Sequence, residues 1–392
     1  MKRVILFAAL CLFFFIGLSA QQRRTVVRKS VSSAANKTTT PKVSNKYAIL
    51  NLVDDWVKER PCESATDIYF FDIYHSDANT LRAVNKETGE VRIVIPRKTR
   101  NRPRVLAVGC DSKDLYLLVA DKGIVKYDGQ SVQTSPLLLA EGGDAKESLK
   151  HNDVIRRIIF SPNGKYAALV GEDNILIDVE QGFKPIRKVS VNHNDIILLD
   201  DGTMVVAAGT DVIVFPFGKP AKVFSKKDIG NGGEGEAVAL YFNETTKTLY
   251  VAMGEQVLKT QFDDIDNIAW KEAFLLPGEN KHFIRFAMNA KHAYGQTSLF
   301  DKQYYDWSAG DLTSTPVITK TIKTDVVDRE QWKENTHKEE IYSLQEHMFY
   351  DQKGNLWLQR GDGSFVIYNP DGISGLTQLK GKVVYHRLPP VD

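Results

Sequence analysis

The sequence of 392 residues predicts an all-β fold built from repeated units of short antiparallel strands. From residue 65 onward, short apolar runs rich in β-branched residues alternate with turns rich in Asp, Asn and Gly, which is typical of successive hairpins. The pattern recurs with a period of about 40 residues, the length of one four-stranded propeller blade. Counting the units predicts a β-propeller of seven blades, with six as the alternative count, and a short helix before it.

Composition and charge exclude several classes of protein. A hydrophobic content of 43% excludes a wholly disordered chain, and a mean hydropathy of −0.27 excludes a protein with many membrane spans. The formal net charge of +2 argues against a dedicated nucleic-acid partner. Three cysteines are too few for a fold held together mainly by disulfides.

Residues 1–20 have the pattern of a secretory signal peptide. Two basic residues precede an apolar run that ends at Leu18, and small residues up to Ala20 offer a cleavage site. The run is short for a bilayer span, so we expect no transmembrane span after cleavage. The alternatives are an uncleaved anchor and lipidation at Cys11. The ending resembles signal peptides of Bacteroidetes, which implies an exported protein in the periplasm or at the cell surface.

Residues 21–46 are predicted to form a flexible basic leader, because they are polar and lack aromatic residues and apolar periodicity. Residues 1–46 contain nine Lys and Arg and no acidic residue, which leaves 42 of the 51 basic residues against all 49 acidic ones in the remainder. A basic leader therefore precedes an acidic body. A contact of this leader with a membrane surface or a glycan is the alternative to a solvated tether.

A helix is predicted over residues 47–61, before the first blade. Its apolar residues follow helical spacing, and Pro61 ends it: Ile49, Leu52, Val53, Trp56 and Val57. We expect this helix to pack against the body.

The repeated units account for residues 62–392. The clearest four cover 105–127, 154–179, 196–215 and 347–368, and weaker copies cover Ile68–Ile95, Ala237–Phe274 and Phe283–Thr319. The run Val383–Arg387 is expected to complete the first or the last blade. Residues 325–342 interrupt the period with a charged segment, which predicts a helical surface insertion in which Trp332 is a candidate partner anchor.

Two units resemble known propeller families. The segment Asn163-Gly164-Lys165-Tyr166-Ala167, which follows Phe160-Ser161-Pro162, is similar to the inner hairpin of bacterial WD-repeat-like propellers. The segment Asp351-Gln352-Lys353-Gly354-Asn355-Leu356-Trp357-Leu358 resembles the repeat of two-component-regulator-type sensor propellers. The resemblance implies an architecture that hosts many functions, and does not imply one activity.

The candidate binding site comes from a repeated tripeptide, His-Asn-Asp, that stands before two predicted innermost strands. Other units place a His or a Glu at the corresponding position, so these side chains are expected to surround the axis on one face: His151, Asn152, Asp153, His193, Asn194, Asp195, Glu236, His282 and His347. Such groups suit a metal ion or an anionic or sugar ligand. The alternative is that they only cap turns and fill polar loops.

Few other residues indicate chemistry. No nucleophile elbow, phosphate-binding loop or zinc-protease helix is present, so we expect no catalytic residue, no cofactor and no metal. After export, Cys62 and Cys110 could pair or remain separate buried thiols. The expected function is a monomeric module that binds a protein, small molecule or glycan on one face. The alternatives are a propeller hydrolase or lyase acting on a glycan and a scaffold for envelope assembly.

Overall fold

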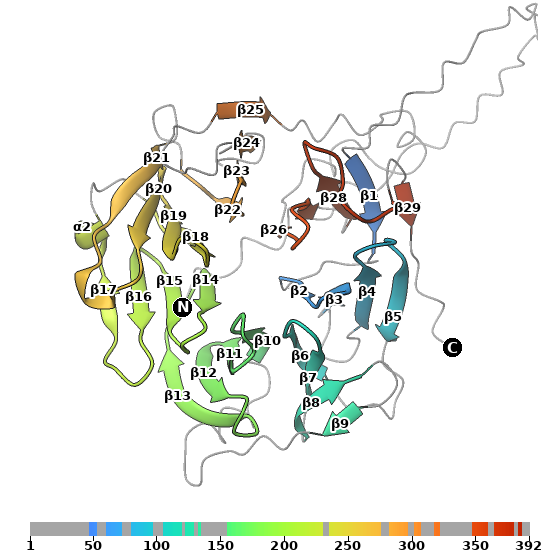
Figure 1. Cartoon of the computed structure of the whole chain (residues 1–392), viewed down its shortest axis with the longest axis horizontal. Coiled ribbons are helices and arrows are strands. Elements are labelled where there is room, and N and C mark those ends of the chain that lie inside the picture. Colours follow the sequence, from blue (N-terminus) through green and yellow to red (C-terminus); the bar gives the residue numbers. More distant parts are fainter. Residues whose placement is uncertain are drawn as a thin grey trace, which may run out of the picture. The chain divides into compact units, whose positions relative to one another are not determined.

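In a computed structural model, the residues that the structure describes form six β-sheets, whose strands are labelled in Figure 1. The structure describes residues 47–52, 60–72, 80–96, 105–119, 122–128, 132–134, 155–229, 235–275, 282–296, 302–306, 317–321, 347–359, 364–379 and 383–385. All of them belong to one compact unit, Val43–Asp392. The predicted signal peptide, the leader and the insertion at 325–342 lie outside the described residues.

Four of the sheets contain four strands in chain order, each antiparallel to the next. Their strands are β2 (Cys62–Glu63), β3 (Asp67–Asp72), β4 (Thr80–Asn85) and β5 (Val91–Ile95); β14 (Asp195–Leu198), β15 (Met204–Ala208), β16 (Asp211–Phe215) and β17 (Lys222–Phe224); β18 (Ala237–Asn243), β19 (Thr248–Met253), β20 (Gln256–Gln261) and β21 (Lys271–Leu275); and β22 (Arg285–Met288), β23 (His292–Gln296), β24 (Lys302–Asp306) and β25 (Val317–Thr321). The predicted strand-turn-strand units are confirmed here.

The eight-stranded sheet consists of two antiparallel halves. One half is β6 (Val105–Cys110), β7 (Leu115–Val119), β8 (Gly123–Tyr127) and β9 (Val132–Thr134), and the other is β10 (Ile155–Phe160), β11 (Tyr166–Gly171), β12 (Asp173–Asp178) and β13 (Lys184–Ser190). A single parallel pair, Arg157 with Val108, joins them. A Cβ atom at Gly109 would lie 2.3 Å from the carbonyl oxygen of Ile158, so glycine permits this close approach.

The last sheet brings the two ends of the described chain together. Its order is β26 (Met348–Tyr350), β27 (Leu356–Gln359), β28 (Ser364–Tyr368), β1 (Tyr47–Asn51) and β29 (Val383–Tyr385). Strand β1 is antiparallel to β28 and parallel to β29. The C-terminal run therefore completes the last sheet, one of the two positions expected for it.

The helix predicted over residues 47–61 is wrong for Tyr47–Asn51, which form β1. The apolar residues there also alternate, and Ala48, Leu50 and Leu52 are buried. Pairing with β28 and β29 satisfies the backbone groups of this segment in a way that an isolated short helix would not. Residues 53–59 of the predicted helix lie outside the described residues.

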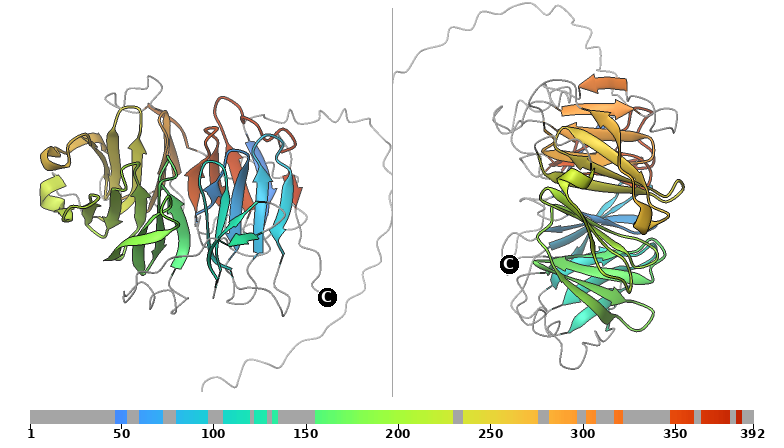
Figure 2. Two further views of the ribbon diagram at one scale, coloured as in Figure 1. Left: turned by 60° about the horizontal axis from the view of Figure 1, so that its bottom comes forward. Right: turned by 90° about the vertical axis from the view of Figure 1, so that its left-hand side faces the viewer.

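Hydrophobic clusters fill the spaces between neighbouring four-stranded units. One cluster lies between β14–β17 and β18–β21, which run side by side (Figure 2). Another joins Tyr294 of β23 to Leu356 of β27, and a third joins Phe70 of β3 to Trp357 of β27, with ring centroids 5.6 Å apart. The described sheets therefore have a propeller-like arrangement.

The described helices are short: α2 (Lys226–Ile229) and the 3₁₀ turn η1 (Ile265–Asn267). Within the described part of the chain, no helix has both the length and the apolar character needed to cross a membrane.

Candidate functional site

Five of the predicted site residues line one cavity of about 640 Å³. They precede or begin the first strands of three sheets, because the starts of β14, β18 and β26 meet at this cavity: His193, Asn194, Asp195, Glu236 and His347. His282 is half-buried and is not among the lining residues. His151, Asn152 and Asp153 lie outside the described residues.

Asp195 fixes the position of β14 against β18. Its Oδ2 accepts a hydrogen bond from the backbone N–H of Leu240 at 2.9 Å, and its Oδ1 accepts one from Ile196 at 2.9 Å. The same Oδ1 lies 3.8 Å from Arg157 and 3.9 Å from Arg60. This buried carboxylate therefore connects two sheets and anchors two guanidinium groups at the cavity.

Asn194 holds the loop that carries Glu236. Its side-chain amide donates to the backbone oxygen of Ala237 at 2.9 Å and to Glu236 Oε2 at 3.2 Å. Gly235, just before, has φ +144°, and a Cβ atom there would lie 2.4 Å from Gly254 Cα. The close glycine contact brings Glu236 to the cavity edge.

His193 lies 3.4 Å through Nδ1 from the backbone oxygen of Val191. Because a carbonyl only accepts, this contact assigns the proton of a neutral ring to Nδ1 and leaves Nε2 as an acceptor. Burial, with the positive charge of Arg157 and Arg156, lowers the pKa of His193 below 6.5, while Asp195 opposes that shift. The ring is therefore neutral at pH 7.

Four arginines at this cavity were not identified from the sequence: Arg60, Arg156, Arg157 and Arg285. Apolar residues complete the lining, among them Val238, Ala239, Ile284, Phe286 and Met348. The signal for two of the arginines is visible in the sequence, because Arg156 and Arg157 interrupt the otherwise apolar run of β10. Two adjacent charged residues inside a predicted innermost strand indicate that part of the strand borders a polar environment.

Register shifts explain how consecutive residues reach the same cavity. The pairing of β10 with β11 shifts between Ile155 and Arg157, and the pairing of β18 with β19 shifts between Ala237 and Ala239. A bulge of this kind redirects one side chain from its regular alternation. Arg156 and Arg157 from β10 therefore both line the cavity.

The described residues include no group of three or more His, Cys, Asp and Glu side chains placed to hold a metal ion. The cavity chemistry consists of guanidinium, imidazole, carboxylate and apolar groups. Guanidinium and neutral imidazole groups are suited to binding polar ligands by hydrogen bonds and charge.

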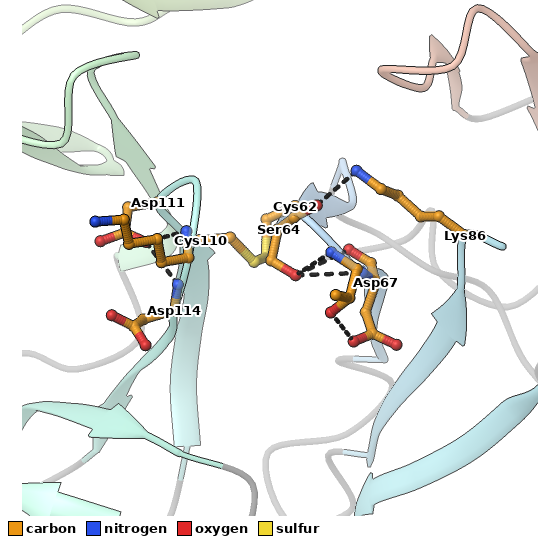
Figure 3. The surroundings of a disulfide bond; sticks show 9 residues. Cys62, Ser64, Asp67, Lys86, Cys110, Asp111 and Asp114 are labelled. Atoms are coloured by element: carbon orange, nitrogen blue, oxygen red, sulfur yellow. Dashed lines mark hydrogen bonds between the residues drawn. A yellow bond between two sulfur atoms is a disulfide. The ribbon is translucent and has the colours of Figure 1, made fainter.

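Cys62 and Cys110 form a disulfide with a Cα–Cα distance of 5.6 Å. The bond connects β2 to the end of β6 and lies beside Ser64, Asp67 and Lys86 (Figure 3). The sequence allows these cysteines either to pair or to remain separate thiols, and the structure pairs them. The bond also fixes the chain two residues after Arg60, which lines the cavity.

Comparisons with known proteins identify the fold. No family model matches the chain, and no curated protein matches its sequence. A chain in the crystal structure of the mitotic checkpoint complex is similar in structure, with a TM-score of 0.53 and 12% identity over 89% of this chain and 99% of that one. The structure of YCF48 bound to D1 peptide gives a TM-score of 0.52 and 11% identity over 83% of this chain and 97% of that one.

These similarities at low sequence identity concern the fold alone. Together with the repeated antiparallel sheets and the clusters between them, they show that the chain is a protein of the β-propeller type.

Proposed function

We propose that the protein is an exported β-propeller of seven blades that binds a ligand or partner at the cavity. The cavity itself carries this proposal: about 640 Å³ lies within the ordinary range for small-molecule sites, and polar groups converge there beside apolar ones. The structure of YCF48 with a bound peptide gives a propeller-type precedent for binding.

Among the described residues, seven hydrophobic clusters support the blade count. Each lies between one sheet and the next when the eight-stranded sheet is counted as two units. Because the halves of that sheet share a single parallel pair, Arg157 with Val108, they meet as neighbouring blades meet at their first strands. The last sheet then forms the seventh blade, to which β1 and β29 contribute.

Export is supported by the disulfide between Cys62 and Cys110, since such bonds persist in oxidising compartments and are rare in the cytosol. The signal-peptide pattern of residues 1–20 supports the same location. The periplasm and the cell surface both satisfy this proposal.

The test is affinity capture from an envelope extract, followed by mass spectrometry of bound proteins and small molecules. Ile284→Glu places a charged side chain on the cavity wall, where Ile284 is 49% exposed. Val223→Glu is the matched control, because Val223 is 57% exposed on the outer strand β17 and is not among the cavity-lining residues. We expect captured components to be lost with Ile284→Glu and kept with Val223→Glu. Equal capture by both variants would overturn the assignment of binding to the cavity.

A further inference from the structure

The charges around the cavity favour an anionic ligand. Four arginines line it against three carboxylates, those of Glu172, Asp195 and Glu236. The charge of Asp195 is already compensated, because it accepts two backbone N–H bonds and lies near two arginines. Glu236 accepts the Asn194 amide. Among the described lining residues, guanidinium groups therefore outnumber carboxylates.

Arg156 is the arginine best placed to bind a ligand. It is exposed and lines the cavity, and no ion pair connects it to another described residue. Its neighbour Arg157, brought to the same cavity by the bulge in β10, is held near Asp195. Two adjacent guanidinium groups provide the forked donors that bind a carboxylate or phosphate.

The same two arginines also act on His193. Arg157 and Arg156 both contribute to lowering its pKa, although burial contributes more. Burial disfavours a charge of either sign, whereas the contribution of the two arginines favours a negative charge at the same place.

An apolar surface accompanies this charge. Ile284 is a large hydrophobic residue that is 49% exposed, and it lines the cavity with Phe286 of β22, Val238 of β18 and Met348 of β26. Exposed apolar area next to convergent polar groups is typical of a site for a ligand with both characters.

We propose that the cavity binds a small organic anion, with its carboxylate or phosphate on Arg156 and Arg157 and its apolar part against Ile284 and Phe286. This inference rests on the proposed function and specifies the class of ligand.

The experiment measures the affinity of the whole protein for four probes by ligand-observed NMR. Hexanoate and hexyl phosphate carry an anion on the same apolar chain, hexanol carries no charge, and acetate lacks the chain. We expect at least one hexyl anion to bind about tenfold or more tightly than hexanol, because a charge-assisted hydrogen bond contributes about 1.5–3 kcal/mol. The tighter of the two anions identifies the head group. Hexanol that binds as tightly as both anions would overturn the proposal, as would acetate that binds as tightly as hexanoate.

Two variants locate the effect. Arg156→Gln should weaken binding of the preferred anion about tenfold and leave hexanol unchanged. Arg187→Gln makes the same substitution on β13, where the guanidinium donates to the backbone oxygen of Lys219 and is not among the cavity-lining groups, and should leave both affinities unchanged. Equal anion affinities in the two variants contradict the site. If hexanol binds as tightly as both anions and Ile284→Glu abolishes its binding, the inference fails while the proposed function stands.

Discussion

Two polar regions of this propeller use similar residues in opposite ways. The closing cluster, defined as Glu63, Ser64, Lys86 and Gln352, connects the first sheet to the last. In it, Lys86 Nζ donates to Ser64 O at 2.6 Å and to Gln352 Oε1 at 2.6 Å, and lies 2.9 Å from Glu63 Oε1. Its side chain is only 5% exposed. At the cavity, by contrast, Arg156 is exposed.

The difference shows which polar residues are committed to the fold. A buried ammonium whose donors are all directed at fixed protein acceptors has no capacity left for a ligand. Burial raises the pKa of Glu63 above 4.5, while the backbone N–H of Gln352 and the charge of Lys86 oppose that shift. Residue type alone therefore does not distinguish a structural charge from a binding one, whereas burial and partners do.

The largest expected effect concerns the disulfide beside the closing cluster. Replacing both Cys62 and Cys110 with Ala should lower the free energy of unfolding by about 4 kcal/mol, because the bond closes a loop with a sequence separation of 48 residues. Urea unfolding of both proteins measures it. Reductant should destabilise the wild type by a similar amount and leave the double variant unchanged. A variant as stable as the wild type would show that the loop ends are held without the bond.

The next effect tests the closing cluster itself. Lys86→Met should cost about 3 kcal/mol of unfolding free energy, because it leaves the partly buried Glu63 carboxylate without its cation. Lys353→Met is the control: its ion-pair partner Glu87 is 71% exposed, and surface pairs contribute at most about 1 kcal/mol. Urea unfolding compares the two, and anion binding should be unchanged in both. Equal destabilisation would contradict the distinction between buried and exposed charges.

Local patterns were sufficient to predict the strand-turn-strand units. The runs that form β11 and β12, separated by a short turn after Gly171, depend only on residues near one another in the chain. Strand β1 failed as a prediction because its partners, β28 and β29, lie more than 300 residues away in the sequence. Apolar residues at Ala48, Leu50 and Leu52 fit a strand face, while the wider segment fitted a helix face. Only the pairing with distant strands decides between strand and helix for this segment.

The site was predictable in the same partial way. His193, Asn194 and Asp195 were found because the tripeptide stands where a loop enters a first strand, and that position faces the cavity. Arg60 was not predictable, because Asp195, which it lies near at the cavity, is far away in the sequence. Arg157 was assigned to an ordinary strand because the sequence does not reveal the bulge in β10.

The smallest effect separates the two regions by the sign of their response to acid. The folded pKa of His193 is lowered below 6.5, so the unfolded chain binds this proton more readily, and the contribution of His193 to stability is lost as pH falls from about 6.5 through the lowered pKa. The folded pKa of Glu63 is raised above 4.5, so its extra stability is present at pH 4.5 and below and is lost as pH rises through the raised pKa.

Acid should therefore weaken the contribution of His193 at the cavity to folding stability and strengthen the contribution of Glu63 in the closing cluster. The measurement is urea unfolding of wild type, His193→Gln and Glu63→Gln between pH 4.5 and 7. At each pH, the unfolding free energy of the variant is subtracted from that of the wild type. The difference in unfolding free energy between wild type and His193→Gln should decrease by less than about 1 kcal/mol toward low pH. The decrease is small because the ring is partly exposed to solvent that screens its interactions. The corresponding difference between wild type and Glu63→Gln should increase over the same titration.

A saturating anion should reduce the stability lost at His193 in acid, because a negative charge beside the imidazole raises its pKa. The same anion should leave the pH response of Glu63 unchanged. If both differences follow pH with the same sign, the two regions do not differ electrostatically as their geometry indicates.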